Sequence, residues 1–177
     1  SGLCCASFVS YVYYNYLPNI AGIDTSSATR PYNLRTATAY NAAANAWVSA
    51  GTARRISFSQ NANGNNFIPS EDIPIGSLII FKHIPTGDIA HVALYAGYYN
   101  GIHFVTHVGN DRGPELSSIV GMSKGDYPEA VVQVVTPEFV EAAGKIEVYK
   151  KDPKGAALSG AYFIATNTST GTEYAIG

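Results

Sequence analysis

Apolar positions along this chain follow a helical period first and a strand period later. In residues 5–16 apolar side chains recur every three or four positions, which predicts a helix that Leu17-Pro18 ends. Residues 37–50 are rich in Ala and predict a second helix, with Gly51 as its C-terminal cap. The Asn-rich residues 61–66 predict a surface turn.

From residue 73 onward, short apolar runs bounded by turn residues predict β-strands. These runs are 77–82, 89–95, 102–108 and 130–135, and 56–58 is a shorter candidate before them. Because successive strands are closely spaced, we expect an antiparallel meander packed against the N-terminal helix. The fold class predicted for residues 1–136 is therefore α+β.

A separate β pattern occupies the end of the chain. Residues 137–144 are typical of a linker, and residues 145–177 contain alternating segments at 145–150, 158–165 and 173–176. The pattern stops within the last of these segments. We therefore expect an incomplete second β-domain, and a chain that is a fragment of a longer protein.

Composition narrows the classes of function. Charged residues are 14% of the 177 residues and the net charge is −2, with no basic stripe, which argues against nucleic-acid binding. No apolar run approaches the ~20 residues that span a bilayer. The neutral, hydroxyl-rich composition suits an exported protein. The two cysteines, Cys4 and Cys5, are adjacent and offer no disulfide framework.

Cys5 is the candidate nucleophile, because it falls in the first turn of the first predicted helix. A thiolate is the reactive form of cysteine, and the unpaired N–H groups at a helix N-terminus stabilise an anion. A histidine from elsewhere in the chain must then act as its base.

His91 is the candidate base among the four histidines. In its strand, strict alternation places His91, Ala93 and Tyr95 on one face. His107 lies on the next predicted strand, close enough to hydrogen-bond with His91 and to select the tautomer of its ring. Two alternatives remain open from these residues alone: a cysteine and histidines that only fill the core, and a zinc site built from them.

Four segments in order resemble the NlpC-type cell-wall cysteine peptidases. They are Cys5-Ala6-Ser7-Phe8-Val9, Pro74-Ile75-Gly76-Ser77-Leu78-Ile79-Ile80-Phe81, Ala90-His91-Val92-Ala93-Leu94-Tyr95-Ala96-Gly97 and Phe104-Val105-Thr106-His107. The resemblance implies a papain-like fold, in which a Cys-bearing N-terminal helix packs on an antiparallel sheet that carries the His.

The same resemblance implies a function for residues 1–136. Cys5, His91 and His107 would form a Cys-His-His triad that hydrolyses peptide bonds in the stem peptides of bacterial peptidoglycan, without cofactor or metal. The backbone N–H of Cys5 would stabilise the oxyanion.

Some positions depart from the family pattern. Cys4 stands where the family has Asp, so Cys4 is a second candidate nucleophile. The related CHAP amidases pair the His with an acidic residue or Asn, for which Asn110 is the candidate. A CHAP-like peptidoglycan amidase and a catalytically inactive surface adhesin or wall-binding protein are therefore the alternative functions.

The terminal segment resembles the opening strands of Cna-B or SpaA-type adhesin modules, which are β-sandwiches of Gram-positive surfaces. The match lies in Val148-Tyr149-Lys150-Lys151-Asp152 and in Leu158-Ser159-Gly160-Ala161-Tyr162-Phe163. It implies that Lys150 is the reactive Lys of an isopeptide bond whose partner lies beyond residue 177. Because the sandwich is cut short, residues 145–177 are expected to be poorly ordered. Extracellular or cell-surface localisation, with covalent surface anchoring of the full-length protein, follows from the same resemblance.

Overall fold

The computed structural model describes residues 4–16, 34–109, 113–124, 126–137, 163–166 and 173–176. The chain divides into two compact units, residues 1–140 and 141–177. Their boundary falls within the segment 137–144 that was expected to be a linker.

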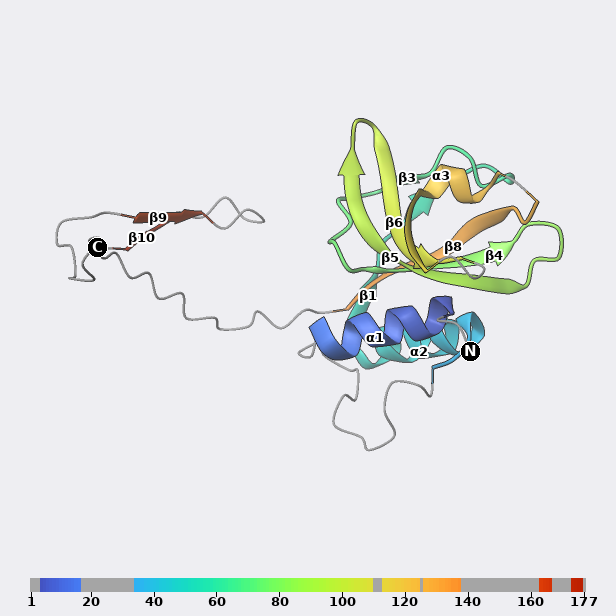
Figure 1. Cartoon of the computed structure of the whole chain (residues 1–177), viewed down its shortest axis with the longest axis horizontal. Coiled ribbons are helices and arrows are strands. Elements are labelled where there is room, and N and C mark those ends of the chain that lie inside the picture. The colour runs from blue at the N-terminus through green and yellow to red at the C-terminus, as the bar shows by residue number, and fades with distance from the viewer. Residues whose placement is uncertain are drawn as a thin grey trace. The chain divides into compact units, whose positions relative to one another are not determined.

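Both predicted helices are present. α1 spans Cys5–Tyr16 and α2 spans Ala37–Ala50. The N-terminus of α2 is capped by the Thr36 hydroxyl, which accepts a hydrogen bond from the Ala39 N–H at 3.0 Å. Its C-terminus is capped by Gly51, whose φ of 74° is the left-handed conformation that glycine tolerates best. The two helices lie side by side on one face of the sheet (Figure 1).

The first unit is built on a six-stranded antiparallel sheet with the order β1-β8-β4-β5-β6-β7. Its strands are, in chain order, β1 (Ala53–Arg55), β4 (Leu78–His83), β5 (Ile89–Tyr99), β6 (Ile102–Val108), β7 (Pro114–Ser118) and β8 (Glu129–Pro137). The α+β class with an antiparallel sheet is therefore confirmed.

The meander prediction is only partly correct. Strands β4, β5, β6 and β7 do follow one another, but β8 returns across the sheet to pair with β4 on its other side. The sequence pattern did not predict β1, β7 or the short helix α3 (Ile119–Met122). The candidate strand 56–58 is also displaced, since β2 covers Phe58–Ser59 and pairs with β3 (Ile68–Pro69).

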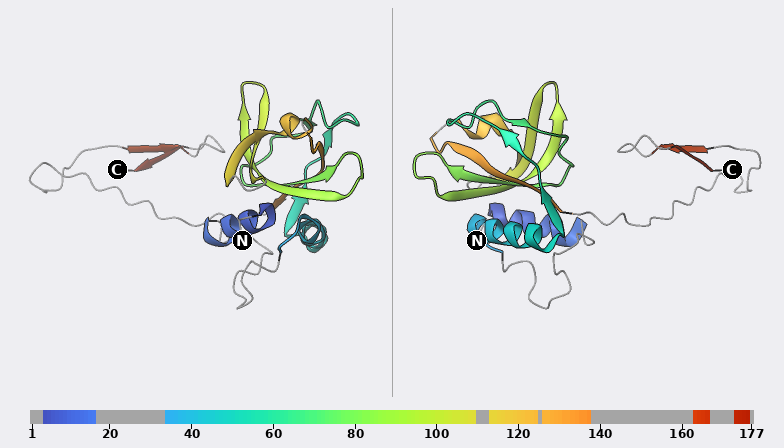
Figure 2. Two further views of the ribbon diagram at one scale, coloured as in Figure 1. Left: turned by 45° about the vertical axis from the view of Figure 1, so that its right-hand side comes forward. Right: turned by 180° about the vertical axis from the view of Figure 1, so that it is seen from behind.

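The sheet is buried on both faces, which explains its nearly continuous apolar strands. Side chains on one face of the sheet, such as Leu78, Ile80 and Val92, pack with α1 and α2. Side chains on the other face, such as Ile79 and Phe81, belong to a second apolar cluster. The views in Figure 2 agree that α3 and β3 cover the face opposite the two long helices. The division of faces predicted for residues 92–95 is confirmed.

The second unit contributes one described feature, an antiparallel pair of strands. β9 (Phe163–Thr166) pairs with β10 (Glu173–Ile176), with Phe163 opposite Ile176. Lys150 and the expected strand 145–150 lie outside the described residues, and so does most of the segment 158–165.

None of the helices that the structure describes has the length and apolar character needed to cross a bilayer.

Candidate active site

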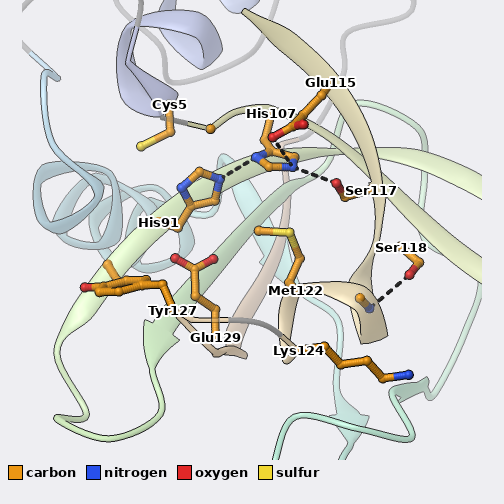
Figure 3. A pocket seen from close by; sticks show the side chains of 13 residues that line it. Cys5, His91, His107, Glu115, Ser117, Ser118, Met122, Lys124, Tyr127 and Glu129 are labelled. Carbon is orange, nitrogen blue, oxygen red and sulfur yellow. Dashed lines mark hydrogen bonds and ion pairs between the residues drawn. The ribbon is translucent and has the colours of Figure 1, made fainter. Parts of the chain in front are cut away.

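Cys5 is the first residue of α1, as the sequence predicts. Its side chain is half-buried and packs against the cluster beneath the sheet, while the same residue also lines a pocket of about 700 Å³. Figure 3 shows that this pocket holds Cys5, His91 and His107 at one end. The fold therefore brings together three side chains that are up to about a hundred positions apart in the chain.

Cys4 has a different position at the start of α1. Its thiol is exposed, lies 3.1 Å from the Ser7 hydroxyl, and accepts the Ser7 backbone N–H at 3.5 Å. Cys4 thus fills the N-cap role of an Asp or Ser. Burial alone would raise the pKa of the Cys4 thiol, but the hydrogen bonds from Ser7 and the neighbouring backbone lower it. Cys5, rather than Cys4, is among the residues that line the pocket.

His91 lies on β5 beside an irregularity in the sheet. The β4–β5 register shifts between Phe81 and Lys82, so that Phe81 faces His91 while Lys82 faces Ile89. Ala90 is therefore an extra residue in β5, and it also lines the pocket. A bulge of this kind redirects the neighbouring side chains, which is one reason why bulges occur next to active sites.

The two central histidines are hydrogen-bonded to one another. Nε2 of His91 lies 3.0 Å from Nδ1 of His107, and the exposed fractions of the two residues are only 9% and 4%. The contact expected between the adjacent strands is confirmed. Since Nε2 of His91 is engaged by His107, its Nδ1 is the ring nitrogen left for the pocket, and Figure 3 shows that nitrogen on the side of Cys5.

His107 is held from its other side by β7. Its Nε2 lies 3.0 Å from the Ser117 hydroxyl and 3.7 Å from Oε1 of Glu115. The β6–β7 register places Glu115 directly opposite His107. The nearby Glu115 carboxylate favours an N–H at Nε2 of His107. In the tautomer set that follows, His107 donates from Nε2 to Ser117 and His91 donates from Nε2 to His107. In that set Nδ1 of His91 carries a lone pair, as a base requires.

Burial favours the neutral forms of His91, His107 and the Cys5 thiol in the absence of substrate. It lowers the pKa of His91 to about 3, with the neighbouring His107 adding to the effect. It also lowers the pKa of His107, against the opposing effect of Glu115. Burial raises the pKa of the Cys5 thiol, although the Val92 and Ala6 backbone N–H groups act in the opposite direction. The resting pair is therefore thiol and imidazole rather than thiolate and imidazolium.

The other two histidines belong to different environments. His103 accepts or donates a hydrogen bond at 2.8 Å with the Tyr95 hydroxyl, and its ring packs edge-on against Phe67. His83 stacks on Tyr127 with ring centroids 3.9 Å apart. Across the described part of the chain, no group of three or more His, Cys, Asp or Glu side chains is arranged to hold a metal ion.

Several pocket residues were not predicted from the sequence. Glu115 and Ser117 come from the missed strand β7, where their two-residue spacing is the signal that could have placed both on one face. Glu129, the first residue of β8, is 6% exposed, and its Oε2 has no hydrogen-bond partner. Burial raises the pKa of Glu129 to about 7. Asn110, the alternative third residue, lies outside the described residues.

Comparison of the chain with protein-family models, with curated proteins and with solved structures finds no match. The pocket is therefore the basis for the functional proposal.

Proposed function

We propose that residues 1–136 form a cysteine peptidase of the NlpC type, which hydrolyses peptide bonds in bacterial peptidoglycan stem peptides. The observation that carries the proposal is the shared pocket, in which Cys5 at a helix N-terminus lies with His91, itself hydrogen-bonded to His107. A helix-borne Cys and a sheet-borne His are also what the resemblance to that family implies.

In the first half of the reaction, Cys5 is the nucleophile and His91 the base. The Cys5 sulfur attacks the carbonyl carbon of the scissile amide while Nδ1 of His91 takes the thiol proton. The C–N bond then breaks, and the same nitrogen returns the proton to the leaving amine. This step leaves the acyl group on Cys5 as a thioester.

In the second half, water replaces the amine. His91 removes a proton from the water as it attacks the thioester, the C–S bond breaks, and the proton passes to the departing sulfur. The products are a carboxylic acid and the original thiol. Because both groups are neutral at rest, proton transfer accompanies attack in each half of the cycle.

His107 acts as a positioning residue. By accepting the Nε2 proton of His91 it holds the tautomer with a free Nδ1, and it remains an acceptor when His91 becomes an imidazolium. Ser117 and Glu115 orient His107 in turn. The Cys5 backbone N–H, at the first position of α1, is suited to stabilise the oxyanion.

The direct partner of His91 favours a peptidase over the alternative CHAP-like amidase. That family pairs its His with an acidic residue or Asn, whereas the described partner of His91 is His107. A wall-binding protein without activity is the remaining alternative, and it predicts no release of amines from wall fragments.

The test is incubation of the protein with purified peptidoglycan fragments, with new amino groups measured by a fluorogenic reagent and cleavage sites by mass spectrometry. We expect amine release that Cys5→Ala abolishes. Cys4→Ala is the matched control and should retain release, because Cys4 caps the helix outside the pocket. Release that survives Cys5→Ala, or no release by the wild-type protein, would overturn the proposal.

A further inference from the structure

Glu129 is a buried acid for which the proposed reaction has no use. It lines the same pocket as Cys5, and Figure 3 shows its carboxyl group projecting from β8 toward the end where Cys5 and His91 lie. Only 6% of the surface of Glu129 is exposed, and its Oε2 has no hydrogen-bond partner. A buried carboxyl group without a partner costs free energy, so a fold keeps one only where something compensates.

The neighbouring cation does not compensate it. Lys124 also lines the pocket, but its exposed side chain points away from Glu129 in Figure 3, and no ion pair within the described residues joins the two. His91 is engaged by His107 and holds no charge at rest. The other charged lining residue is Glu115, a second acid. The interior of the pocket is therefore suited to a positive group.

The backbone around Glu129 is held firmly in place. Its carbonyl oxygen packs against Gly64, where an added Cβ would lie 2.9 Å from that oxygen. Glu129 also pairs with His83 across the β4–β8 ladder, and His83 stacks on Tyr127 at the pocket wall. A fixed and largely buried carboxylate is a preorganised receptor for an ammonium group.

We propose that Glu129 is a specificity-determining residue, whose carboxylate binds a primary ammonium group of the peptide substrate beside the scissile bond. The inference rests on the proposed function, because it assigns a subsite within the same pocket. Glu129 and Cys5 line the same pocket, and the Glu129 carboxyl group points toward the end that holds Cys5 and His91, which places the recognised amine near the reacting atoms. Loss of one charged hydrogen bond of this kind corresponds to about a tenfold or larger loss of affinity.

The test uses one synthetic stem peptide that contains L-lysine, in four forms: both amines free, the α-amine acetylated, the ε-amine acetylated, and both acetylated. For the wild-type protein, acetylation of the amine that Glu129 binds should lower kcat/KM about tenfold or more, whereas acetylation of the other amine should not. Glu129→Gln, which keeps the shape and removes the charge, should bring the ratio between free and blocked peptides close to one. Glu129→Asp should restore part of the preference. Glu71→Gln is the matched control, since Glu71 pairs with the exposed Arg54 elsewhere, and should keep the full ratio.

Calorimetric titration of the same peptides into the Cys5→Ala protein separates the two proposals. If the wild-type protein cleaves nothing but the Cys5→Ala protein prefers the free amine in a Glu129-dependent manner, the peptidase proposal fails, and Glu129 is an ammonium-binding residue of the pocket rather than a determinant of cleavage specificity. If all four peptides are cleaved and bound with equal efficiency, or if Glu129→Gln keeps the preference, the Glu129 subsite is wrong while the peptidase stands. Circular dichroism of each variant shows that it is folded.

Discussion

At the level of single residues, the pocket is defined by polar side chains that the fold buries at a cost. His91, His107 and Glu129 are all more than nine-tenths inaccessible, within an otherwise apolar region. The two histidines are hydrogen-bonded to one another, and His107 is also hydrogen-bonded to Ser117. Oε2 of Glu129, in contrast, has no hydrogen-bond partner. The first pair is thus suited to hold a proton at a defined atom, and the acid is suited to receive a ligand.

The positioning role of His107 can be separated from the role of the base. His107→Ala should lower kcat about a hundredfold, because His91 then loses the acceptor that selects its tautomer. The measurement is steady-state hydrolysis of wall peptides as a function of pH. Ser117→Ala, one hydrogen bond further away, should cost less than His107→Ala and leave KM nearly constant. Equal kcat for wild type and His107→Ala would contradict this role.

Glu129 should make the stability of the protein depend on pH in a predictable direction. Its pKa is about 7 in the folded state against 4.5 for an unperturbed Glu, so the folded state binds more protons between these values. Stability contributed by the protonated acid is complete below pH 4.5 and is lost as the pH rises through 7. The titratable and charged groups around the same pocket are Cys5, His91, His107, Glu115, Lys124 and Tyr127, with His83 stacked behind Tyr127.

Glu129→Gln removes this single titration and leaves the others in place. We therefore compare the free energy of unfolding of the variant with that of the wild type at each pH. The difference in favour of the variant should be about 1 to 3 kcal/mol larger at pH 8 than at pH 4.5. Urea denaturation at the two pH values measures the difference. The same gain at both pH values would show that Glu129 is not the titrating group.

At the level of elements, the pocket depends on how β8 begins. Glu129 opens β8, and the turn that contains Gly64 packs directly on its first residues. Gly64 has φ of 71°, and a Cβ there would lie 2.9 Å from both the Glu129 carbonyl oxygen and Cβ of Ser123. This contact links a loop in the first half of the chain to the pocket wall.

Gly64→Ala should therefore destabilise the protein by about 2 to 4 kcal/mol through both steric overlap and left-handed strain. Gly87→Ala is the matched control. Gly87 has φ of 77°, but nothing lies within 4 Å of an added Cβ, so only the conformational cost of about 1 kcal/mol applies. Chemical denaturation of both variants gives the comparison. Equal losses would mean that Gly64 is required for its conformation alone.

At the level of the whole molecule, the proposed chemistry belongs to one unit. Every described residue that lines the pocket lies within residues 1–140, and so do the described members of both core clusters.

A chain that ends at Val140 should consequently keep kcat/KM on wall peptides within about twofold of the longer chain, since separate units contribute independently. Parallel assays of the two proteins at equal concentration check this. A large loss of activity with an unchanged circular dichroism spectrum would indicate that residues 141–177 contribute to the site.

The sequence by itself determined the local elements and the faces of the strands. α1, α2 and β6 have the predicted bounds, and the alternation around His91 correctly places Ala93 and Tyr95 on its face, because hydrogen bonds within a helix and side-chain alternation along a strand depend only on nearby residues. The adjacency of β5 and β6 also followed from their short connection, and it brings His91 to His107.

Only the tertiary structure decided which distant segments complete the pocket. β8 pairs with β4 rather than extending the meander, and that choice places Glu129 in the pocket with Cys5. The short, half-exposed β7 brings Ser117 and Glu115 to His107. Strand pairing across long separations depends on the packing of the entire sheet, and no local period encodes it. For the same reason the neighbours Cys4 and Cys5 could be separated into a helix cap and a pocket residue only once α1 was seen against the sheet.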